Sequence, residues 1–362
     1  MTVRILQGDC LERMAELEAG SVDAVVTDPP YGLAFMGKEW DHGVPGVPFW
    51  QAALRVAKPG AHLVAFGGTR TYHRLACAIE DAGWEIRDSL VWCYGSGFPK
   101  SHNLDGDWEG FGTALKPSQE PIVLARKPLC GTVAANVTEH GTGALSIEAS
   151  RVGTERRFNP PTTKGKTAAL GSFENCDGHG TTVAGRWPPN LLLSHAPTCT
   201  EAECAEGCPV RIMDEQSGEL SSGSRKAGNH KRVGYHGDKG GAMPEVVGDS
   251  GGASRFFPRF RYEAKASSEE RTRGAKHIEA RHPTQKPVEL MRWLVRLVTP
   301  PGGTVLDPFA GSGTTGIAAD REGFNTILIE REAEYVEIAE ARCKGDSPLF
   351  AEVVVEREST PP

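Results

Sequence analysis

Two short motifs near opposite ends of the chain share one design, an apolar strand that runs directly into an aspartate and a tight turn. The first is Asp28-Pro29-Pro30-Tyr31, which follows the apolar residues 25–27, and the second begins at Asp307 after the apolar residues 304–306. In an open α/β sheet, ligands bind just beyond the carboxyl ends of the strands. If these two strands are neighbours, a ligand and its reaction partner would lie side by side between the two turns.

The segments around both motifs alternate between strand and helix patterns. We expect strands at residues 3–7, 23–27, 61–66, 84–94, 121–126, 304–306 and 325–329, and helices at residues 11–17, 49–57, 72–82, 288–297, 315–321 and 334–342. Such alternation is typical of a mostly parallel sheet with helices on both faces, and it predicts an α/β fold. Residues 131–276 are instead rich in Gly, Ser, Thr, Pro and His, which predicts loops or a segment that orders on a partner.

These patterns divide the chain of 362 residues into four parts. The expected limits are 1–130 for the part that carries the first motif, 131–276 for a loop-rich insert, 277–345 for the part that carries the second motif, and 346–362 for a polar, frayed tail. The insert also differs in charge. Residues 221–276 hold 12 Lys and Arg against 6 Asp and Glu, whereas the whole chain has a net charge of −7. One basic segment on an acidic body is typical of a local contact with a polyanion.

Composition excludes two other classes of protein. Nine cysteines, an odd number and mostly isolated, argue against a disulfide framework. No apolar stretch is long enough to cross a bilayer, and the N-terminal residues lack the pattern of a signal peptide. We therefore expect no membrane partner and, by default, a cytoplasmic location.

The second motif has the pattern of a nucleotide-binding turn. Gly311 and Gly313 would allow close backbone approach to a ligand, and the next helix begins at once with its free N–H groups facing the same space. Glu330, at the end of the following strand, suits the diol of a ribose. The spacing Phe-x-Gly-x-Gly differs from the Gly-x-Gly-x-x-Gly of pyrophosphate sites. It favours a cofactor with ribose and adenine but no phosphate, for which S-adenosylmethionine is the first candidate.

The first motif suits an exocyclic amine on a flat ring. Its two prolines remove two backbone donors, so that the Asp28 carboxylate and the Pro29 carbonyl could each accept one amine N–H. Tyr31 could stack on the ring. A negative charge at Asp28 would stabilise the charge that develops on nitrogen during methyl transfer. The alternative is an ordinary proline-rich turn with a surface aspartate.

Taken together, the two motifs resemble those of the amino-group DNA methyltransferases, whose signatures are Asp/Asn/Ser-Pro-Pro-Tyr and Phe-x-Gly-x-Gly. Gly8-Asp9-Cys10 matches the family segment that contacts the cofactor adenine, and His282-Pro283-Thr284-Gln285-Lys286-Pro287 resembles the segment before the cofactor turn. The order of the motifs resembles the beta-type permutation. On this resemblance the catalytic residues would be Asp28, Pro29, Pro30 and Tyr31. The cofactor would contact Asp9, Cys10, Asp28, Lys286, Asp307, Phe309, Gly311, Ser312, Gly313, Thr314 and Glu330.

The resemblance implies a Rossmann-like methyltransferase fold with a seven-stranded sheet and an inserted target-recognition region. It implies methylation of a flipped base in double-stranded DNA, with Asp28 favouring adenine N6 over cytosine N4. A bacterial or phage restriction-modification role, a homodimer and a cognate restriction enzyme are left open. Methylation of RNA or of a protein amide, and a catalytically silent DNA-binding module, are the weaker alternatives.

Two features of the insert point to binding. Candidate contacts to phosphate or base edges are Arg225, Lys226, Lys231, Arg232, Arg255, Arg259 and Arg261. His195, Cys199, Cys204 and Cys208 place four soft ligands within 14 residues, as a structural zinc site requires. The spacing lacks the usual Cys-x2-Cys pair, so reduced cysteines in a loop are the alternative.

The segment before the insert offers further candidates. The target base could be bordered by residues 95–100, with Phe98, and by the nearby Trp92. Lys116 and Glu120 are expected to be structural.

Overall fold

The strand that leads into the first motif lies in the middle of the main sheet. In the computed structural model, β2 (Val22–Thr27) is buried along its whole length, as expected of an apolar run covered on both faces. The structure describes residues 1–33, 43–95, 97, 101–159, 166–167, 171–172, 181–200, 203–223, 228–230, 241–243, 248–261, 285–346 and 352–357. None of the helices within these ranges is long and apolar enough to cross a membrane.

The main sheet contains ten strands in the order β15-β10-β4-β5-β3-β2-β16-β17-β1-β18. Their bounds are β1 Thr2–Gln7, β3 Ala57–Phe66, β4 Glu85–Cys93, β5 Gln119–Arg126, β10 Leu191–Ser194, β15 Arg259–Phe260, β16 Thr304–Asp307, β17 Asn325–Glu330 and β18 Glu352–Glu356. Among these strands only β5 pairs antiparallel with its neighbours, so the sheet is mostly parallel, as predicted. The seven strands from β4 to β1 form one continuous block, and three more strands extend its edges.

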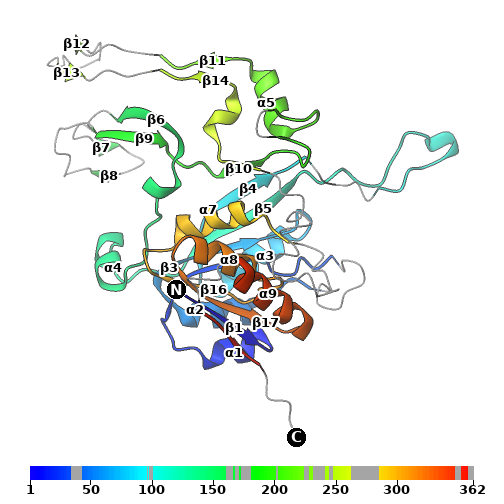
Figure 1. Cartoon of the computed structure of the whole chain (residues 1–362), viewed down its shortest axis with the longest axis vertical. Coiled ribbons are helices and arrows are strands. Elements are labelled where there is room, and N and C mark those ends of the chain that lie inside the picture. Colours follow the sequence, from blue (N-terminus) through cyan, green and yellow to red (C-terminus); the bar gives the residue numbers. More distant parts are fainter. Residues whose placement is uncertain are drawn as a thin grey trace, which may run out of the picture.

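Helices cover both faces of this sheet (Figure 1). Their bounds are α1 Cys10–Glu16, α2 Val47–Val56, α3 Tyr72–Asp81, α7 Val288–Val298, α8 Thr314–Arg321 and α9 Ala333–Asp346. Successive residues of a strand point to opposite faces. Accordingly, Val25 packs in the core under α1 to α3, whereas Ala24 and Val26 pack in the core under α7 and α8. This α/β/α arrangement confirms the predicted fold class.

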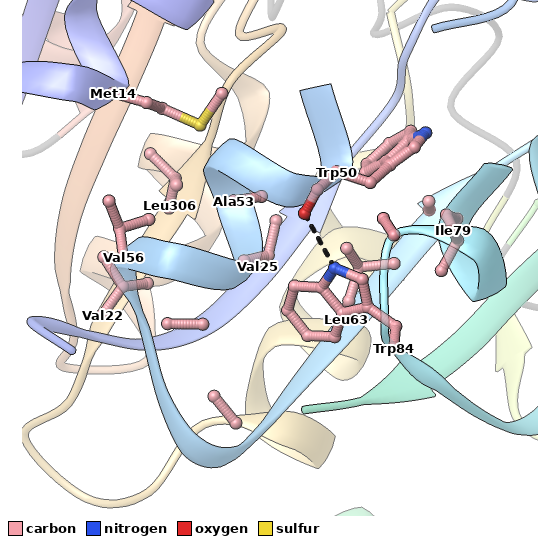
Figure 2. Close-up of a cluster of buried hydrophobic side chains, with 14 of the residues drawn as sticks. Met14, Val22, Val25, Trp50, Ala53, Val56, Leu63, Ile79, Trp84 and Leu306 are labelled. Atoms are coloured by element: carbon pink, nitrogen blue, oxygen red, sulfur yellow. Dashed lines mark hydrogen bonds between the residues drawn. The ribbon is translucent and has the colours of Figure 1, made fainter. Parts of the chain in front are cut away.

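The first of these cores is built around two buried tryptophans (Figure 2). Trp50 of α2 is fully buried, and its carbonyl accepts a hydrogen bond of 3.0 Å from the indole nitrogen of Trp84. A buried indole N–H needs such a partner. The pair fixes α2 against the segment that enters β4, and thereby fixes the helix beside the candidate site.

Two parts of the chain differ from the expectation. The insert is not only loops, because its strands β10 and β15 extend the main sheet beyond β4. It also contains α4 (Val133–His140), α5 (Pro209–Ser217) and the hairpin of β6 (Val152–Asn159) and β9 (Thr181–Arg186). Several of its elements gather beyond β4 at one end of the molecule (Figure 1). The frayed tail is wrong as well, since α9 continues to Asp346 and β18 pairs in parallel with β1.

Candidate active site

The two motifs meet at adjacent strand ends. β2 and β16 are parallel neighbours, with Val25 opposite Leu306, so their carboxyl ends lie at the same edge of the sheet. The hydroxyl of Thr27 donates a hydrogen bond of 2.6 Å to the carboxylate of Asp307. The predicted juxtaposition of the two turns is therefore confirmed.

A cavity of about 750 Å³ opens at this edge. That volume is in the usual range for small-molecule and cofactor sites. Its walls include all the predicted catalytic and cofactor residues except Gly313, namely Asp9, Cys10, Asp28, Pro29, Pro30, Tyr31, Lys286, Asp307, Phe309, Gly311, Ser312, Thr314 and Glu330. The three segments 8–10, 28–31 and, apart from Gly313, 307–315 thus face one space.

The glycine turn has the backbone geometry that its sequence predicts. Gly311 and Gly313 have φ angles of 52° and 75°, in the left-handed region that favours glycine. A Cβ on Gly313 would lie 2.9 Å from the Cβ of Ala339 in α9, so helix packing also requires glycine there. The buried guanidinium of Arg342 donates to the Ser312 carbonyl at 2.6 Å and to the hydroxyl of Thr314 at 3.1 Å. Arg342 gave no signal in the sequence, because its contact depends on the packing of α9.

Asp307 lines the cavity, but its carboxylate oxygens are already engaged in hydrogen bonds that hold the turn. Its carboxylate accepts hydrogen bonds from Thr27 at 2.6 Å, from Thr315 at 2.5 Å and from the backbone N–H of Phe309 at 3.1 Å. Burial raises the pKa of Asp307 to about 6, although the bonds from Thr27 and Thr315 act in the opposite direction. This side chain is therefore well suited to fix the strand end.

Glu330 and Asp9 place two further carboxyl groups in the wall of the cavity. Glu330 ends β17 and accepts hydrogen bonds from the backbone N–H groups of Gly311 at 2.8 Å and Glu332 at 2.9 Å. Burial raises the pKa of Glu330 to about 7. Asp9 is the N-cap of α1, where its side chain accepts from the Leu11 N–H at 2.8 Å. Next to it, burial raises the pKa of Cys10 to about 12, so the thiol is neutral and contributes shape.

Asp28 and Tyr31 of the first motif belong to a half-buried charge cluster whose other members, Glu120 and the buried Lys286, are remote in sequence. The ammonium of Lys286 lies 2.5 Å from one carboxylate oxygen of Asp28, and the Tyr31 hydroxyl donates to the other at 2.9 Å. The same hydroxyl lies 2.9 Å from a carboxylate oxygen of Glu120, which is 3.3 Å from Lys286. Burial alone would lower the pKa of Lys286, but Asp28 and Glu120 raise it overall. Burial and the same two carboxylates raise the pKa of Tyr31 well above its usual value.

Glu120, which the sequence predicts to be structural, lies in the cavity wall. It lies in β5, which pairs antiparallel with β4 so that Glu120 is opposite Trp92, and both side chains line the cavity. The sequence between the two motifs gave no indication that β5 inserts beside β3. Lys116, the other residue expected to be structural, donates a hydrogen bond of 2.6 Å to the Gly95 carbonyl.

Aromatic side chains form another wall. Trp92 is 5% exposed, and its indole N–H donates to Ser194 at 2.8 Å, which holds the ring in the core. Tyr94 lies with its ring centre 4.9 Å from that of Trp92 and also lines the cavity. Trp92 is thus a core residue with one side on the cavity. Phe98, Ser96, Pro99 and Lys100 lie outside the described residues.

Four of the seven residues predicted to contact phosphate or base edges lie outside the described residues. These are Arg225, Lys226, Lys231 and Arg232, and the same holds for His282, Pro283 and Thr284. Arg259 and Arg261 are exposed. Arg255 is different, because its guanidinium is buried, pairs with Asp249 at 3.2 Å and donates to the Gly252 carbonyl at 2.8 Å. Arg255 is therefore held by hydrogen bonds within its own loop.

The cluster of His195 and three cysteines lies at the end of β10 and lines no part of the cavity.

The fold and the paired turns define the class of protein to which the chain should be compared. A family model described as DNA methylase, of the N6/N4 type, matches residues 22–341. This match covers most of the chain and both motifs. The chain therefore belongs to the N6/N4 DNA methylase family.

Curated relatives match over a shorter segment. The chain is 45% identical over 67 residues to the type II methyltransferase M2.DpnII of Streptococcus pneumoniae and, over an equal length, to the type II methyltransferase M.HinfI of Haemophilus influenzae. Each match covers 18% of this chain, but only 25% of the first relative and 19% of the second. A solved structure, the cytosine-N4-specific PvuII DNA methyltransferase, is 16% identical with a TM-score of 0.46 and covers 94% of this chain and 86% of its own.

Proposed function

We propose that this chain transfers a methyl group from S-adenosylmethionine to the exocyclic amine of a base flipped out of double-stranded DNA, with adenine N6 as the first target. One observation carries the proposal: the Asp-Pro-Pro-Tyr turn and the glycine turn end adjacent parallel strands and line one cavity. The family membership of residues 22–341 supports it.

The donor side of the cavity suits a cofactor with ribose and adenine. When bound, S-adenosylmethionine supplies an electrophilic methyl group on a sulfonium. Glu330 and Asp9 would accept hydrogen bonds from ribose hydroxyls and polar edges, while Phe309 and Cys10 offer apolar surface. The left-handed backbone at Gly311 lets the chain approach the ligand closely. Ser312 and Thr314 complete this wall, and hydrogen bonds from the Arg342 guanidinium to both hydroxyls hold them in place.

The acceptor side suits an amine that develops positive charge. Two carboxylates, Asp28 and Glu120, surround the Lys286 cation, so the three groups together are negative. Asp28 already accepts hydrogen bonds from Lys286 and Tyr31, but a carboxylate has about four acceptor sites, so an amine N–H can be added. With the Pro29 carbonyl, it would hold both amine hydrogens and direct the nitrogen lone pair to the methyl group. This preorganised arrangement is the main catalytic contribution of the chain.

The remaining features extend this proposal. The order of catalytic turn, insert and glycine turn supports a beta-type member, with 1–130 and 277–345 forming the methyltransferase part and 131–276 recognising the target. The basic surplus of residues 221–276 supports a DNA contact in that region. Stacking on Tyr94 or Trp92 would offset part of the few kcal/mol that base flipping costs.

The deciding experiment is methylation of unmodified plasmid DNA, followed by mass spectrometry of its nucleosides. N6-methyldeoxyadenosine is the expected product, and N4-methyldeoxycytidine would show that cytosine is the target instead. Parallel reactions with RNA and with protein test the other acceptors. A methyl group that is transferred only to protein or RNA, and not to DNA, would overturn the proposal.

The variant Asp28→Ala separates chemistry from cofactor binding. We expect a loss of methyl transfer of at least ~10²-fold, the usual cost of removing one preorganised electrostatic partner. Binding of S-adenosylhomocysteine, measured by calorimetry, should change little, because Asp28 lies on the acceptor side. Asp107→Ala, at an exposed aspartate, is the matched control. Unchanged turnover in Asp28→Ala would refute the proposed role.

A further inference from the structure

Four soft ligand atoms converge at the far edge of the main sheet. His195 directly follows β10, and Cys208 is the N-cap of α5, while Cys199 and Cys204 lie in the loop between these two elements. The backbone N–H of His195 donates to the Phe260 carbonyl at 2.9 Å, which fixes the first ligand to β15. Because both ends of the loop are anchored, its side chains are brought together by regular structure.

The spacing of these atoms is close to that of a tetrahedral metal site. One atom from each of the four side chains lies within 4.8 Å of all the others. The Nδ1 atom of His195 is 3.2 Å from the Cys204 sulfur and 3.8 Å from the Cys208 sulfur. Zn–S bonds of about 2.3 Å and Zn–N bonds of about 2.0 Å give tetrahedron edges of roughly 3.5 to 3.8 Å. We propose that His195, Cys199, Cys204 and Cys208 bind one zinc ion.

The donor set selects the type of ion and its role. Three sulfurs and one imidazole favour Zn²⁺ over the hard cations, which prefer oxygen ligands. The backbone N–H of Ala205 donates to the Cys199 sulfur at 3.2 Å, a contact that stabilises a thiolate. Four protein ligands leave no open position for substrate, and none of them lines the cavity. The site is therefore structural and does not depend on the proposed methyl transfer.

Zinc would stabilise a region that has little core of its own. Among the described residues, the hydrophobic cluster beneath this loop adds only Leu193, Ala196 and Val210 to Cys208 as buried side chains. Gly95, two residues after β4, packs on the end of this loop and the start of α5, since a Cβ at Gly95 would lie 3.2 Å from the Gly207 carbonyl and 2.9 Å from Pro209. Its neighbour Tyr94 lines the cavity. The ion thus supports the loop against which one wall of the candidate active site is packed.

The test begins with the metal content of the full-length chain purified in reductant without chelator. Elemental analysis should find about one zinc per chain, the stoichiometry of a closed four-ligand site. Cys204→Ser and Cys208→Ser should lose most of it. Cys77→Ser and Cys130→Ser are the matched controls, because both cysteines are exposed and lie outside the cluster, and they should retain the zinc.

A second measurement avoids variants that fail to fold. Replacement of the ion in the wild-type chain by Co²⁺ should produce the intense sulfur-to-cobalt absorption and the visible bands of a tetrahedral site. A chelator should lower the melting temperature of wild-type protein. A chain that stays free of metal after incubation with zinc, or that yields no tetrahedral cobalt spectrum, would overturn the proposal.

Discussion

At the scale of single residues, the candidate site is defined by contacts between parts of the chain that are remote in sequence. Asp28 and Lys286 are separated by 258 positions, yet they form an ion pair of 2.5 Å in the cavity wall. The first motif predicted a site residue at Asp28, and the family resemblance of residues 282–287 implied one at Lys286. Their contact could not be predicted, because it requires the segment before α7 to cross the end of β2. Glu120 was expected to be only structural for the same reason, because its place beside Lys286 depends on the packing of remote segments.

The raised pKa of Glu330 predicts that the wall proposed to hold the cofactor is sensitive to pH. Its pKa is raised by burial from 4.5 to about 7, so the carboxyl is mainly neutral at pH 6 and mainly ionised at pH 8. Ionising it in the free protein costs stability as pH rises from 4.5 through 7. An ionised carboxylate accepts hydrogen bonds from hydroxyls more strongly than a neutral one. We therefore expect S-adenosylhomocysteine to bind several-fold more tightly at the higher pH.

Calorimetric titrations across this pH range check the prediction. Glu330→Gln, which keeps the shape and removes the ionisation, should bind the ligand more weakly and with a much flatter pH dependence. An equal pH dependence in wild-type and variant proteins would show that another group is responsible.

At the scale of elements, the alternating segments near both ends of the chain were predictable and the insert was not. The apolar pattern of β2, β16 and β17 and the amphipathic α7 gave nearly the observed limits. In contrast, β15 has two residues and β10 has four, too few for a periodic signal. The strand β18 was overlooked because its setting is polar, although Val353 and Val355 pack on the core beside β1. Short strands of this kind form only because a sheet edge is already present.

The contact between the glycine turn and α9 gives a prediction at this scale. Gly313→Ala must accept both a φ of 75° and a Cβ at 2.9 Å from Ala339, so α9 has to shift. Left-handed backbone costs a non-glycine residue about 1 kcal/mol, and the close contact adds to this. We expect an unfolding free energy lower by about 2 to 4 kcal/mol, within the range for overpacking combined with strain, and weaker cofactor binding.

Gly20→Ala is the matched control for this variant. Gly20 has a similar φ of 68° but no atom within 4 Å of the Cβ position. Denaturant unfolding of the two variants isolates the cost of the helix contact. If both lose the same stability, the packing of α9 against the turn contributes nothing.

At the scale of the whole molecule, charge is segregated along the chain. The net charge is −7, but residues 221–276 carry twice as many Lys and Arg as Asp and Glu. The two exposed arginines of this segment that the structure places, Arg259 and Arg261, lie in or directly after β15, the outermost strand of the main sheet. If the chain binds DNA as proposed, an acidic body would repel the duplex except where such a segment meets it, and the segment would then orient the duplex as well as bind it.

Replacing Arg225, Lys226, Lys231 and Arg232 together by alanine tests this role. If these side chains neutralise phosphates, DNA affinity falls, and the slope of log K against log salt becomes less steep by about 0.9 for each phosphate that is no longer neutralised. Binding of S-adenosylhomocysteine should be unchanged, because the residues proposed to hold the cofactor belong to other segments of the chain. The control replaces Lys344 and Arg357, which both pair with Glu340, and it should leave the slope as it is. A quadruple variant with the wild-type salt slope would remove this segment from the DNA interface, even if the methyl-transfer chemistry at Asp28 is intact.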